Sequence, residues 1–518
     1  MAGVAGLMGP FGAGKGRVCA VAAAGKAAEM ARQVRAAWRE TPTVELRLDW
    51  LVSDGERKKL LDWVKKQKLR GKVLLATCRR VPAGGKFAGS VEGQLYWLVQ
   101  ARDAGCEWCD VEVETLRKLP GKSVRAYPVP PRVMLSVHDF DRTPALPKKI
   151  RVPDHGDVDA MKIAANARTI EDSVRLTALA RRSKNFVAVP MGETGLPARI
   201  LALRAGSALA YAPVGEATAP GQVSLREMMH LYRAHKLTSR TRVYGVIGNP
   251  VGHSLSPLMH NTAFITRGVD AVYVPFLVRS LKDFLACVGA VGLRGFSVTR
   301  PHKETIVRHL KECDALAAEI GAVNTVVVRQ NGSLYGCNTD YVGVLRSLEK
   351  KMRLRGSRVL ILGAGGAARA AAFALAHAGA TVGICARREA PAKNLARAAG
   401  GEFVPRRALR SERFDAILNA TPVGLYPHSE ESPLEASELR CDVVMDVINR
   451  PLQTKLLRMA RKKGIATVSG VEMFVAQGVA QWELWMGRRA PEQEMRRVVL
   501  RSLRAEEKAA AAKNRSGS

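Results

Sequence analysis

Short apolar runs alternate with amphipathic stretches between residues 17 and 236. Eight of these short apolar runs are candidate strands: RVCAVAA, TVELRLDW, KVLLATCR, CDVEVE, RVMLSVHDF, DAMKIAA, NFVAVP and ALAYAPV. Most are followed by a helical pattern, such as KAAEMARQVRAAWRE after the first run. This regular alternation predicts a (β/α)8 barrel, with an open parallel sheet as the alternative.

A polar, basic pause at residues 237–241 separates this region from a second one, which opens with the apolar run VYGVIG. Further on, SRVLILGAGGAARAAAFALAHAGA predicts a strand, a tight glycine turn and an alanine-rich helix, the pattern of a dinucleotide-binding lobe. The later helix VEMFVAQGVAQWELWMG is expected to return to the first lobe. The expected order is a flexible tail (1–16), the barrel (17–237), a substrate lobe (238–345, completed by 472–506), a Rossmann-type lobe (346–471) and a second tail (507–518).

Composition changes this picture little. The 518 residues, 47% hydrophobic and 25% charged, describe a multidomain globular protein. No apolar run is long enough for a membrane span and no signal peptide is apparent, so a cytoplasmic location is expected. The nine cysteines include a lone CxxC at 106–109 and predict no metal site. The net charge of +34 is spread along the chain without aromatic interleaving, which favours a basic surface that attracts anionic substrates over a nucleic-acid module.

The strand period places polar side chains toward the inside of the predicted barrel. Glu45 and Arg47 share one face of their strand, while His138 shares a face with Ser136 and Lys162 shares one with Ala164. Barrel interiors are normally filled by branched apolar residues, so inward charges need partners. The simplest explanation is an active site at the C-terminal mouth of the barrel.

The motifs ELRLD, TCR, SVHDF, MKIA, MGETGLPAR and ATAPGQ occur in this order, each at a predicted strand end or in the following loop. Together they resemble type I 3-dehydroquinate dehydratases over essentially the whole first half. The resemblance implies that Lys162 forms an imine with the substrate ketone and that His138 is the general acid/base. Substrate contacts implied in the same way fall on Glu45, Arg47, Arg79, Arg199, Thr218 and Gln222. One position departs from the family, because Ala83 stands where a glutamate commonly assists the histidine.

The chemistry explains why these two residue types occur together. Removing a proton next to a ketone requires an electron sink, and a protonated imine is a better sink than a carbonyl. A histidine can take that proton and return one to the departing hydroxyl, since it titrates near neutrality. Burial and nearby arginines are expected to favour the neutral, nucleophilic form of Lys162.

The second half carries VYGVIGNPVGHSLSP, GFSVTRPHKE, GAVNTVV, YGCNTDYVG, LILGAGGAARA, NATPVGL and VEMFVAQ in this order. These motifs resemble shikimate dehydrogenases from about residue 242 to residue 506. By resemblance, Lys303 and Asp340 form the catalytic pair, because a lysine ammonium can neutralise and protonate the alkoxide that hydride addition creates. The resemblance implies that Ser254 and Ser256 hydrogen-bond the substrate carboxylate. It also implies contacts with the ring hydroxyls from Thr299, Asn324 and Gln477. The implied cofactor contacts are Gly363, Ala364, Gly365, Gly366, Ala367, Arg387, Arg388, Asn419, Thr421 and Gly470.

The strand after the glycine turn indicates which cofactor is used. Where an NAD enzyme carries an acidic residue for the ribose hydroxyl, this chain has Ala386 followed by Arg387 and Arg388. Two guanidinium groups favour a 2′-phosphate, so NADP is expected. Ala368 replaces the third glycine of the fingerprint.

Together the two resemblances imply two successive steps of aromatic biosynthesis on one chain, from 3-dehydroquinate through 3-dehydroshikimate to shikimate. Small-molecule substrates are the expected partners, with no specific nucleic acid and no membrane, and the sequence does not indicate an oligomeric state. Ser297 and Ile448 depart from residues common in shikimate dehydrogenases. Two alternatives stay open at this point: quinate dehydrogenation by the second half, and a basic nucleic-acid-associated protein built on metabolic folds.

Overall fold

The structure is a computed structural model that describes residues 11, 13–144, 158–181, 185–215 and 221–516. It comprises two compact units. The first contains Met1–Arg242 together with Val274–Gly292, and the second contains Val243–Tyr273 together with Leu293–Ser518.

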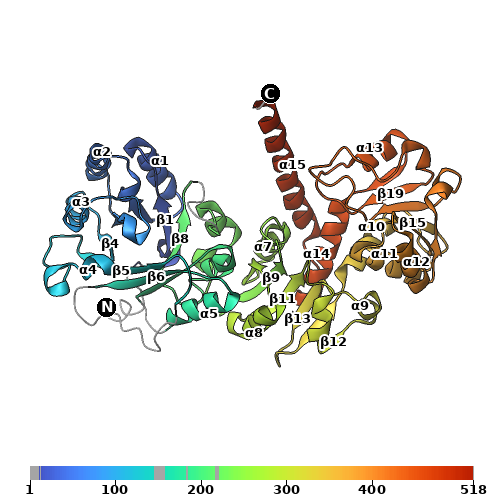
Figure 1. Ribbon diagram of the computed structural model, residues 1–518, viewed down its shortest axis with the longest axis horizontal. Coiled ribbons are helices and arrows are strands. Elements are labelled where there is room, and N and C mark those ends of the chain that lie inside the picture. Colours follow the sequence, from blue (N-terminus) through green and yellow to red (C-terminus); the bar gives the residue numbers. More distant parts are fainter. Residues whose placement is uncertain (1–10, 12, 145–157, 182–184, 216–220, 517–518) are drawn as a thin grey trace. The chain divides into compact units, whose positions relative to one another are not determined.

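Eight parallel strands form the sheet of the first unit in the order β7-β6-β5-β4-β3-β2-β1-β8 (Figure 1, blue to green). They are β1 (Val18–Ala22), β2 (Thr43–Arg47), β3 (Val73–Thr77), β4 (Trp108–Glu112), β5 (Arg132–Asp139), β6 (Ala160–Asn166), β7 (Phe186–Met191) and β8 (Ala210–Pro213). The outer strands of this order meet, because the N–H of Ala208 donates to the carbonyl of Phe186 at 2.8 Å. The predicted barrel with its eight strands is confirmed, and the open sheet was the wrong alternative.

These strands are connected by the helices α1 (Ala27–Ala37), α2 (Asp54–Lys65), α3 (Val91–Asp103), α4 (Val113–Leu116), α5 (Ile170–Leu179) and α6 (Leu196–Ile200). Helix α8 (Leu281–Val291) lies later in the chain, after the last barrel strand, but is grouped with the same unit. Helix α1 buries Met30, Val34 and Ala37, one stripe at helical spacing. Helix α5 begins with a capping box, in which Thr169 and Asp172 satisfy each other's backbone N–H groups.

The expected N-terminal tail does not extend to residue 16. Phe11 is 3% exposed and its ring centroid lies 4.2 Å from that of Trp108, within an apolar cluster formed with β-strand residues such as Met134. Gly14–Arg17 form a 3-10 helix. A large aromatic side chain stabilises this segment against the barrel, an effect that the glycine-rich composition concealed.

The second unit holds two six-stranded sheets. The first has the order β10-β9-β11-β13-β14-β12 and is formed by β9 (Arg242–Gly248), β10 (Ala271–Leu277), β11 (Leu293–Val298), β12 (Glu312–Cys313), β13 (Thr325–Val328) and β14 (Leu334–Cys337). Helices α7 (Ser256–Thr266) and α9 (Ala315–Ile320) belong to the same lobe. Residues 274–292, with the end of β10 and α8, are grouped with the first unit.

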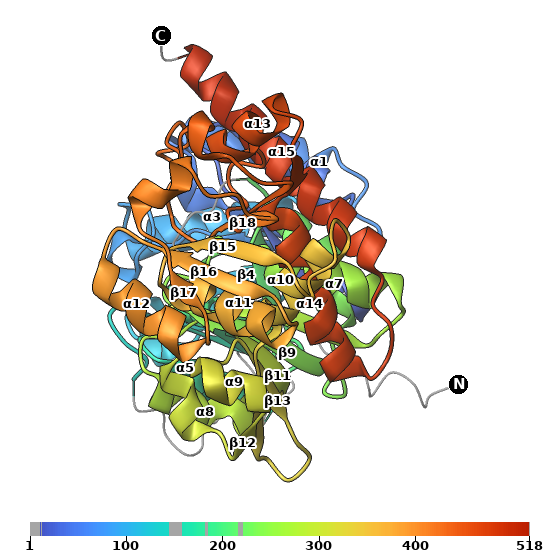
Figure 2. The same ribbon diagram turned by 90° about the vertical axis from the view of Figure 1, so that its right-hand side faces the viewer.

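The second sheet is parallel, with the order β17-β16-β15-β18-β19-β20, and is of the Rossmann type (Figure 2). Its strands are β15 (Arg358–Leu362), β16 (Thr381–Cys385), β17 (Glu402–Phe403), β18 (Ala416–Asn419), β19 (Val443–Asp446) and β20 (Ala466–Val468). Its helices are α11 (Gly366–His377), α12 (Glu389–Ala398) and α13 (Lys455–Lys462). Ala368 is fully buried in α11, where the helix packs on the sheet.

Two long helices link the lobes of the second unit. Helix α10 (Thr339–Glu349) packs closely on α14 (Gly470–Met486), because a Cβ on Gly343 would come within 2.9 Å of the carbonyl oxygen of Met473. Helix α15 (Glu492–Ser516) follows and extends through most of the expected C-terminal tail (Figure 1, red). That expectation was wrong for 507–516, since alanine, glutamate and lysine are strong helix formers that continue the preceding helix.

Two candidate active sites

A cavity of about 210 Å³ lies in the barrel and is lined by side chains from most of its strands. The residues predicted for dehydration that line it are Glu45, Arg47, Arg79, His138, Lys162, Arg199 and Gln222. The structure therefore brings together side chains that are up to 177 positions apart, as their place at successive strand ends predicts. The remaining candidate, Thr218, lies outside the described residues.

Lys162 projects from β6 and is 4% exposed. Its Nζ contacts Oδ2 of Asp110 on β4, and it lies 5.0 Å from the ring centroid of Tyr211. Asp110 also accepts hydrogen bonds from Ser136 Oγ at 2.5 Å and Arg79 at 3.1 Å. Burial alone would raise the pKa of Asp110, but Lys162, Arg79 and His138 hold it well below its usual range, so Asp110 stays a carboxylate.

Asp110 is the residue that the sequence reasoning missed. Arginines were expected to surround Lys162, whereas its immediate partner is an anion. The string CDVEVE carries the signal, because Asp110 and Glu112 alternate with apolar residues on a strand that faces a charged interior.

His138 stands at the end of β5, with its ring stacked on Phe140 at a centroid distance of 6.1 Å. Its Nδ1 is buried without a hydrogen-bond partner among the described residues. Burial, followed by the charges of Arg79 and Lys162, lowers the pKa of His138 well below 6.5, and Asp110 offsets only part of this effect. The imidazole is therefore neutral at physiological pH and can accept a proton.

The departure at Ala83 leaves His138 without a carboxylate at that position. Ala83 is 9% exposed and ends a 3-10 helix formed by Val81–Ala83. A methyl group there can neither orient the imidazole nor stabilise its charged form.

The arginines of the cavity differ in whether a carboxylate balances their positive charge. Arg47 forms two hydrogen bonds with Asp49, at 2.9 and 2.8 Å. Arg199, by contrast, donates from Nε to the carbonyl oxygen of Pro190 at 2.6 Å and has no carboxylate partner among the described residues. Burial lowers the pKa of Arg199 to about 10, so the guanidinium group is still charged at neutral pH.

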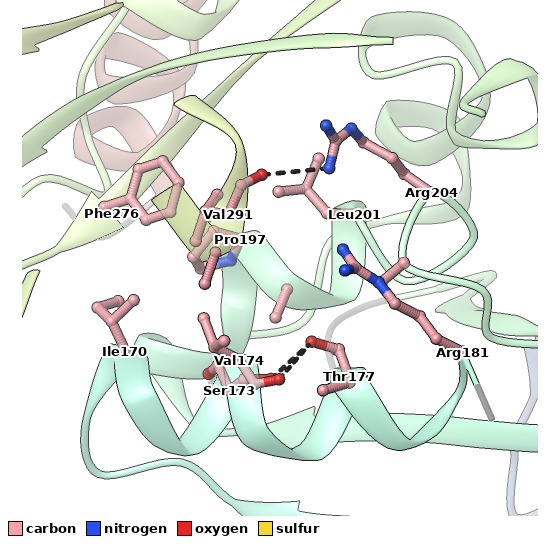
Figure 3. Close-up of a pocket in the computed structure, with 14 residues that line it drawn as sticks. Ile170, Ser173, Val174, Thr177, Arg181, Pro197, Leu201, Arg204, Phe276 and Val291 are labelled. Atoms are coloured by element: carbon pink, nitrogen blue, oxygen red, sulfur yellow. Dashed lines mark hydrogen bonds between the residues drawn. The ribbon is translucent and has the colours of Figure 1, made fainter. Parts of the chain in front are cut away.

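A separate pocket of about 140 Å³ in the first unit is mostly apolar (Figure 3). Ile170, Val174, Leu201, Phe276 and Val291 line it. It contains none of the predicted catalytic or substrate-binding residues, so it is not a candidate site for the reaction.

The second unit has a cleft of about 490 Å³ between its two lobes. All predicted dehydrogenase residues of the substrate lobe line it: Ser254, Ser256, Thr299, Lys303, Asn324, Asp340 and Gln477. Two predicted cofactor residues, Ala367 and Gly470, line the same cleft. Substrate and cofactor candidates therefore share one space.

Lys303 and Asp340, which both line this cleft, form an ion pair with Nζ 2.6 Å from Oδ2. Asn324 donates to the other oxygen of Asp340 at 2.8 Å. The amide oxygen of Asn324 in turn accepts from the backbone N–H of Thr339 at 2.7 Å, at the start of α10. This chain of contacts fixes the carboxylate and, through it, the position of the ammonium group.

A second, fully buried network supports the substrate side. Gln481 Oε1 accepts from Ser297 Oγ at 2.9 Å and lies 3.1 Å from Nε2 of His260. Tyr273 donates its hydroxyl to Ser297 at 2.6 Å. Ser297 therefore has a structural role, and His260 and Tyr273 are members that the sequence reasoning did not identify. Ile448, the other departure, is 5% exposed and packs near Gly424.

The glycine turn between β15 and α11 has the form that a bound dinucleotide requires. Gly363 has φ +111°, a conformation that favours glycine. A Cβ on Gly365 or Gly366 would meet no atom within 4 Å, so both glycines border open space at the N-terminus of α11. A pyrophosphate fits such a place, where backbone N–H groups and the helix dipole favour an anion.

The turn after β18 is shaped by Asn419 and Thr421. The Asn419 amide oxygen accepts from the backbone N–H and hydroxyl of Thr421 at 3.0 and 2.6 Å, and its amide nitrogen donates to buried Asp446 at 3.1 Å. These bonds fix a loop at the carboxyl end of a strand next to β15, the usual place for a dinucleotide.

Arg387 and Arg388 follow the end of β16, and both are exposed. Neither forms an ion pair with a carboxylate among the described residues. Two unpaired guanidinium groups at the end of the second strand of a Rossmann sheet fit a 2′-phosphate.

Within the described ranges, no cluster of histidine, cysteine, aspartate or glutamate side chains could hold a metal ion. No helix in the part of the chain that the structure describes is long and apolar enough to cross a membrane.

Comparisons with known families agree with both sites. The type I 3-dehydroquinase family matches residues 18–239. The shikimate dehydrogenase substrate binding domain matches residues 246–326, and the shikimate 5′-dehydrogenase C-terminal domain matches residues 470–500.

The relatives named here cover either most of the chain or about half of it. The chain is 34% identical over 480 residues to the chloroplastic bifunctional 3-dehydroquinate dehydratase/shikimate dehydrogenase of Arabidopsis thaliana, covering 87% of this chain and 78% of that protein. It is 42% identical to a shikimate dehydrogenase (NADP(+)) of Bacillus cytotoxicus, covering 51% of this chain and 99% of the relative. Thermus thermophilus shikimate 5-dehydrogenase, solved with NADP(H) and shikimate, is 36% identical, with a TM-score of 0.47, over 51% of this chain and 100% of that chain. Two catalytic units in this order, with a relative that spans both, show that the chain belongs to the family of bifunctional 3-dehydroquinate dehydratase/shikimate dehydrogenases.

Proposed function

We propose that the protein converts 3-dehydroquinate into shikimate in two steps. The barrel removes water to give 3-dehydroshikimate, and the second unit reduces this ketone with NADPH. The observation that carries the first step is the buried Lys162 beside a neutral His138 in one cavity. The Lys303–Asp340 pair in the cleft supports the second step.

In the first step, the neutral His138 takes a proton from the Lys162 ammonium group, and Nζ attacks the ketone carbon. This proton and a second one from Nζ convert the carbonyl oxygen into water, which leaves and gives a protonated imine. His138 removes a proton from the adjacent carbon, and the imine accepts the electron pair. The same histidine returns this proton to the hydroxyl that leaves from the next carbon. Hydrolysis of the imine consumes one water, so the net reaction releases one.

Asp110 positions the lysine and keeps its charge compensated between turnovers. It does not take the proton from Lys162 itself, because its pKa is too low. Arg199 is proposed to hold the substrate carboxylate, since it is buried in the cavity and has no carboxylate partner in the part of the chain that the structure describes.

In the second step, NADPH supplies a hydride to the ketone carbon. Negative charge then develops on the substrate oxygen, and Lys303 neutralises and protonates it while Asp340 holds the ammonium group in place. Ser254, Ser256, Thr299, Asn324 and Gln477 are proposed to bind the substrate, and Arg387 with Arg388 the 2′-phosphate.

Several finer statements stay predictions from the sequence. They are the domain boundaries near residues 237 and 345, the cytoplasmic location and the absence of a nucleic-acid partner. Quinate dehydrogenation is the alternative activity of the second unit, and a direct comparison of quinate with shikimate as substrate decides it. The other alternative, a basic nucleic-acid-associated protein built on metabolic folds, is disfavoured. Every described catalytic candidate has the partner or cavity that its proposed catalytic role needs.

The test uses the full chain with 3-dehydroquinate and borohydride, which reduces an imine to a stable amine. We expect one adduct on Lys162, located by mass spectrometry, and none on Lys86, which lines the same cavity. Lys162→Ala should lose dehydration and retain reduction of supplied 3-dehydroshikimate, and Lys303→Ala should do the opposite. An adduct on another lysine, or no adduct with active enzyme, would disprove the assignment.

A further inference from the structure

The dehydrogenase cleft is lined by more positively charged side chains than have a carboxylate partner among the described residues. Three lysine or arginine side chains line it, Arg300, Lys303 and Arg450. Lys303 is paired with Asp340 at 2.6 Å, and Arg450 with Glu506 at 2.9 Å. Among the described residues, Arg300 has no carboxylate partner.

Arg300 is placed by backbone contacts beside the loop that carries the two predicted carboxylate-binding serines. It comes two residues after the end of β11, and its carbonyl oxygen accepts from the N–H of Asn249 at 3.0 Å. The preceding residue, Thr299, donates its N–H to Ile247 at 2.9 Å. The segment 299–303 and the loop that starts at residue 249 therefore lie side by side at one wall of the cleft.

The substrate proposed for this cleft carries a carboxylate. The only partners predicted for this carboxylate from the sequence are the hydroxyl groups of Ser254 and Ser256. Ser254 and Ser256 can donate one hydrogen bond each from their side chains, but neither carries charge. A guanidinium group offers a fork of donors that matches a carboxylate and is stronger than a neutral donor.

We propose that Arg300 binds the substrate carboxylate together with Ser254 and Ser256, and so makes the dehydrogenase selective for anionic ring acids. This inference rests on the proposed function of the second unit and names a further specificity residue for it. A phosphate of the cofactor is the less suitable partner, because the glycine turn at Gly365 and the arginine pair at Arg387 belong to the opposite lobe.

The test measures oxidation of shikimate and of its uncharged methyl ester by NADP in Arg300→Gln and Arg300→Lys. We expect Arg300→Gln to raise the KM for shikimate roughly tenfold, since the lost interaction is charged but partly solvated. The KM for the methyl ester should change little, so the preference for the acid should shrink by the same factor. Arg300→Lys should restore part of this preference.

Arg294→Gln is the matched control, because Arg294 is an exposed arginine of β11, the strand that leads to Arg300, and does not line the cleft. Dehydratase activity and the far-UV spectrum of each variant report correct folding, and Arg300→Lys decides the question if Arg300→Gln does not fold. An unchanged acid/ester preference, or a rise in the KM for NADP alone, would overturn the inference. Failure of the wild type to oxidise shikimate would instead contradict the proposed function.

Discussion

Protonation of His260 is expected to destabilise the second unit in mild acid. The ring is fully buried and stacks on Tyr273 at 4.6 Å. Gln481 Oε1 is an amide oxygen and can only accept, so Nε2 of His260 must be the donor. Nδ1 then carries no proton, and it has no hydrogen-bond partner among the described residues. A second proton would place a charge and an unpaired N–H at Nδ1 inside the core.

The size of this effect follows from the pKa. Burial, only partly offset by the hydrogen bond to Gln481, lowers the pKa of His260 from 6.5 to about 4. The unfolded chain therefore binds a proton below pH 6.5, whereas the folded unit does so only near pH 4. Stability is present above pH 6.5 and is lost as the pH falls through this window, by up to about 1.4 kcal/mol per pH unit and about 3 kcal/mol in total.

The assay is urea-induced unfolding at several pH values between 6.5 and 4, followed by the residual dehydrogenase activity after rapid return to neutral pH. Only the second unit then contributes to the readout. His260→Phe keeps an aromatic ring in the stack but cannot titrate, so its stability should fall less steeply with decreasing pH than that of the wild type. Equal slopes for the two proteins would refute the reasoning, whatever their absolute stabilities.

Three further outcomes are expected. Arg387→Gln should raise the KM for NADPH roughly tenfold and leave that for NADH nearly unchanged, whereas Arg397→Gln on the exposed face of α12 should change neither. The NMR chemical shifts of the His138 ring carbons should not change with pH near 6.5, and a midpoint there would contradict the buried, neutral state of this ring. The signals are assigned in histidine-labelled protein by comparison with His138→Gln. Asp110→Asn should lower the free energy of unfolding of the barrel by ~3–5 kcal/mol at neutral pH, because Lys162 and Arg79 stay buried with less compensation, while exposed Asp62→Asn should have little effect.

The sequence predicted the barrel well because its periodicity is local. All eight barrel strands were found, and the alternation in TVELRLDW places Glu45 and Arg47 in the cavity as expected. Tertiary contacts explain what was missed. Phe11 looks like part of a glycine-rich tail until Trp108, nearly 100 positions away, gives it a partner.

The same contrast between local sequence patterns and tertiary contacts applies to the site residues. Residues within recognisable motifs, such as Lys162 and Asp340, were found from the sequence, but their partners were harder to find. Asp110 and His260 act through contacts whose partners are 52 and 221 positions away, and no local pattern reveals such distant pairs. Arg300 was hidden for another reason, because its importance is apparent only after the ion pairs of its neighbours are known.

Helix α14 has a consequence for hydride transfer. Gly470, at its first turn, is a cofactor candidate, and a Cβ there would come within 2.3 Å of the carbonyl oxygen of Ile448 in the Rossmann-type lobe. Gln477 is a substrate candidate on the same helix, and Trp485 near its end donates to Val326 in the substrate lobe at 3.1 Å. Seven helical residues span ~10 Å, a length that lobe closure cannot change while the helix stays intact. One continuous helix therefore sets the separation between cofactor and substrate. Insertion of a single residue between 470 and 477 would rotate Gly470 relative to Gln477 by ~100° about the helix axis. Hydride transfer should then stop, although both binding residues are still present.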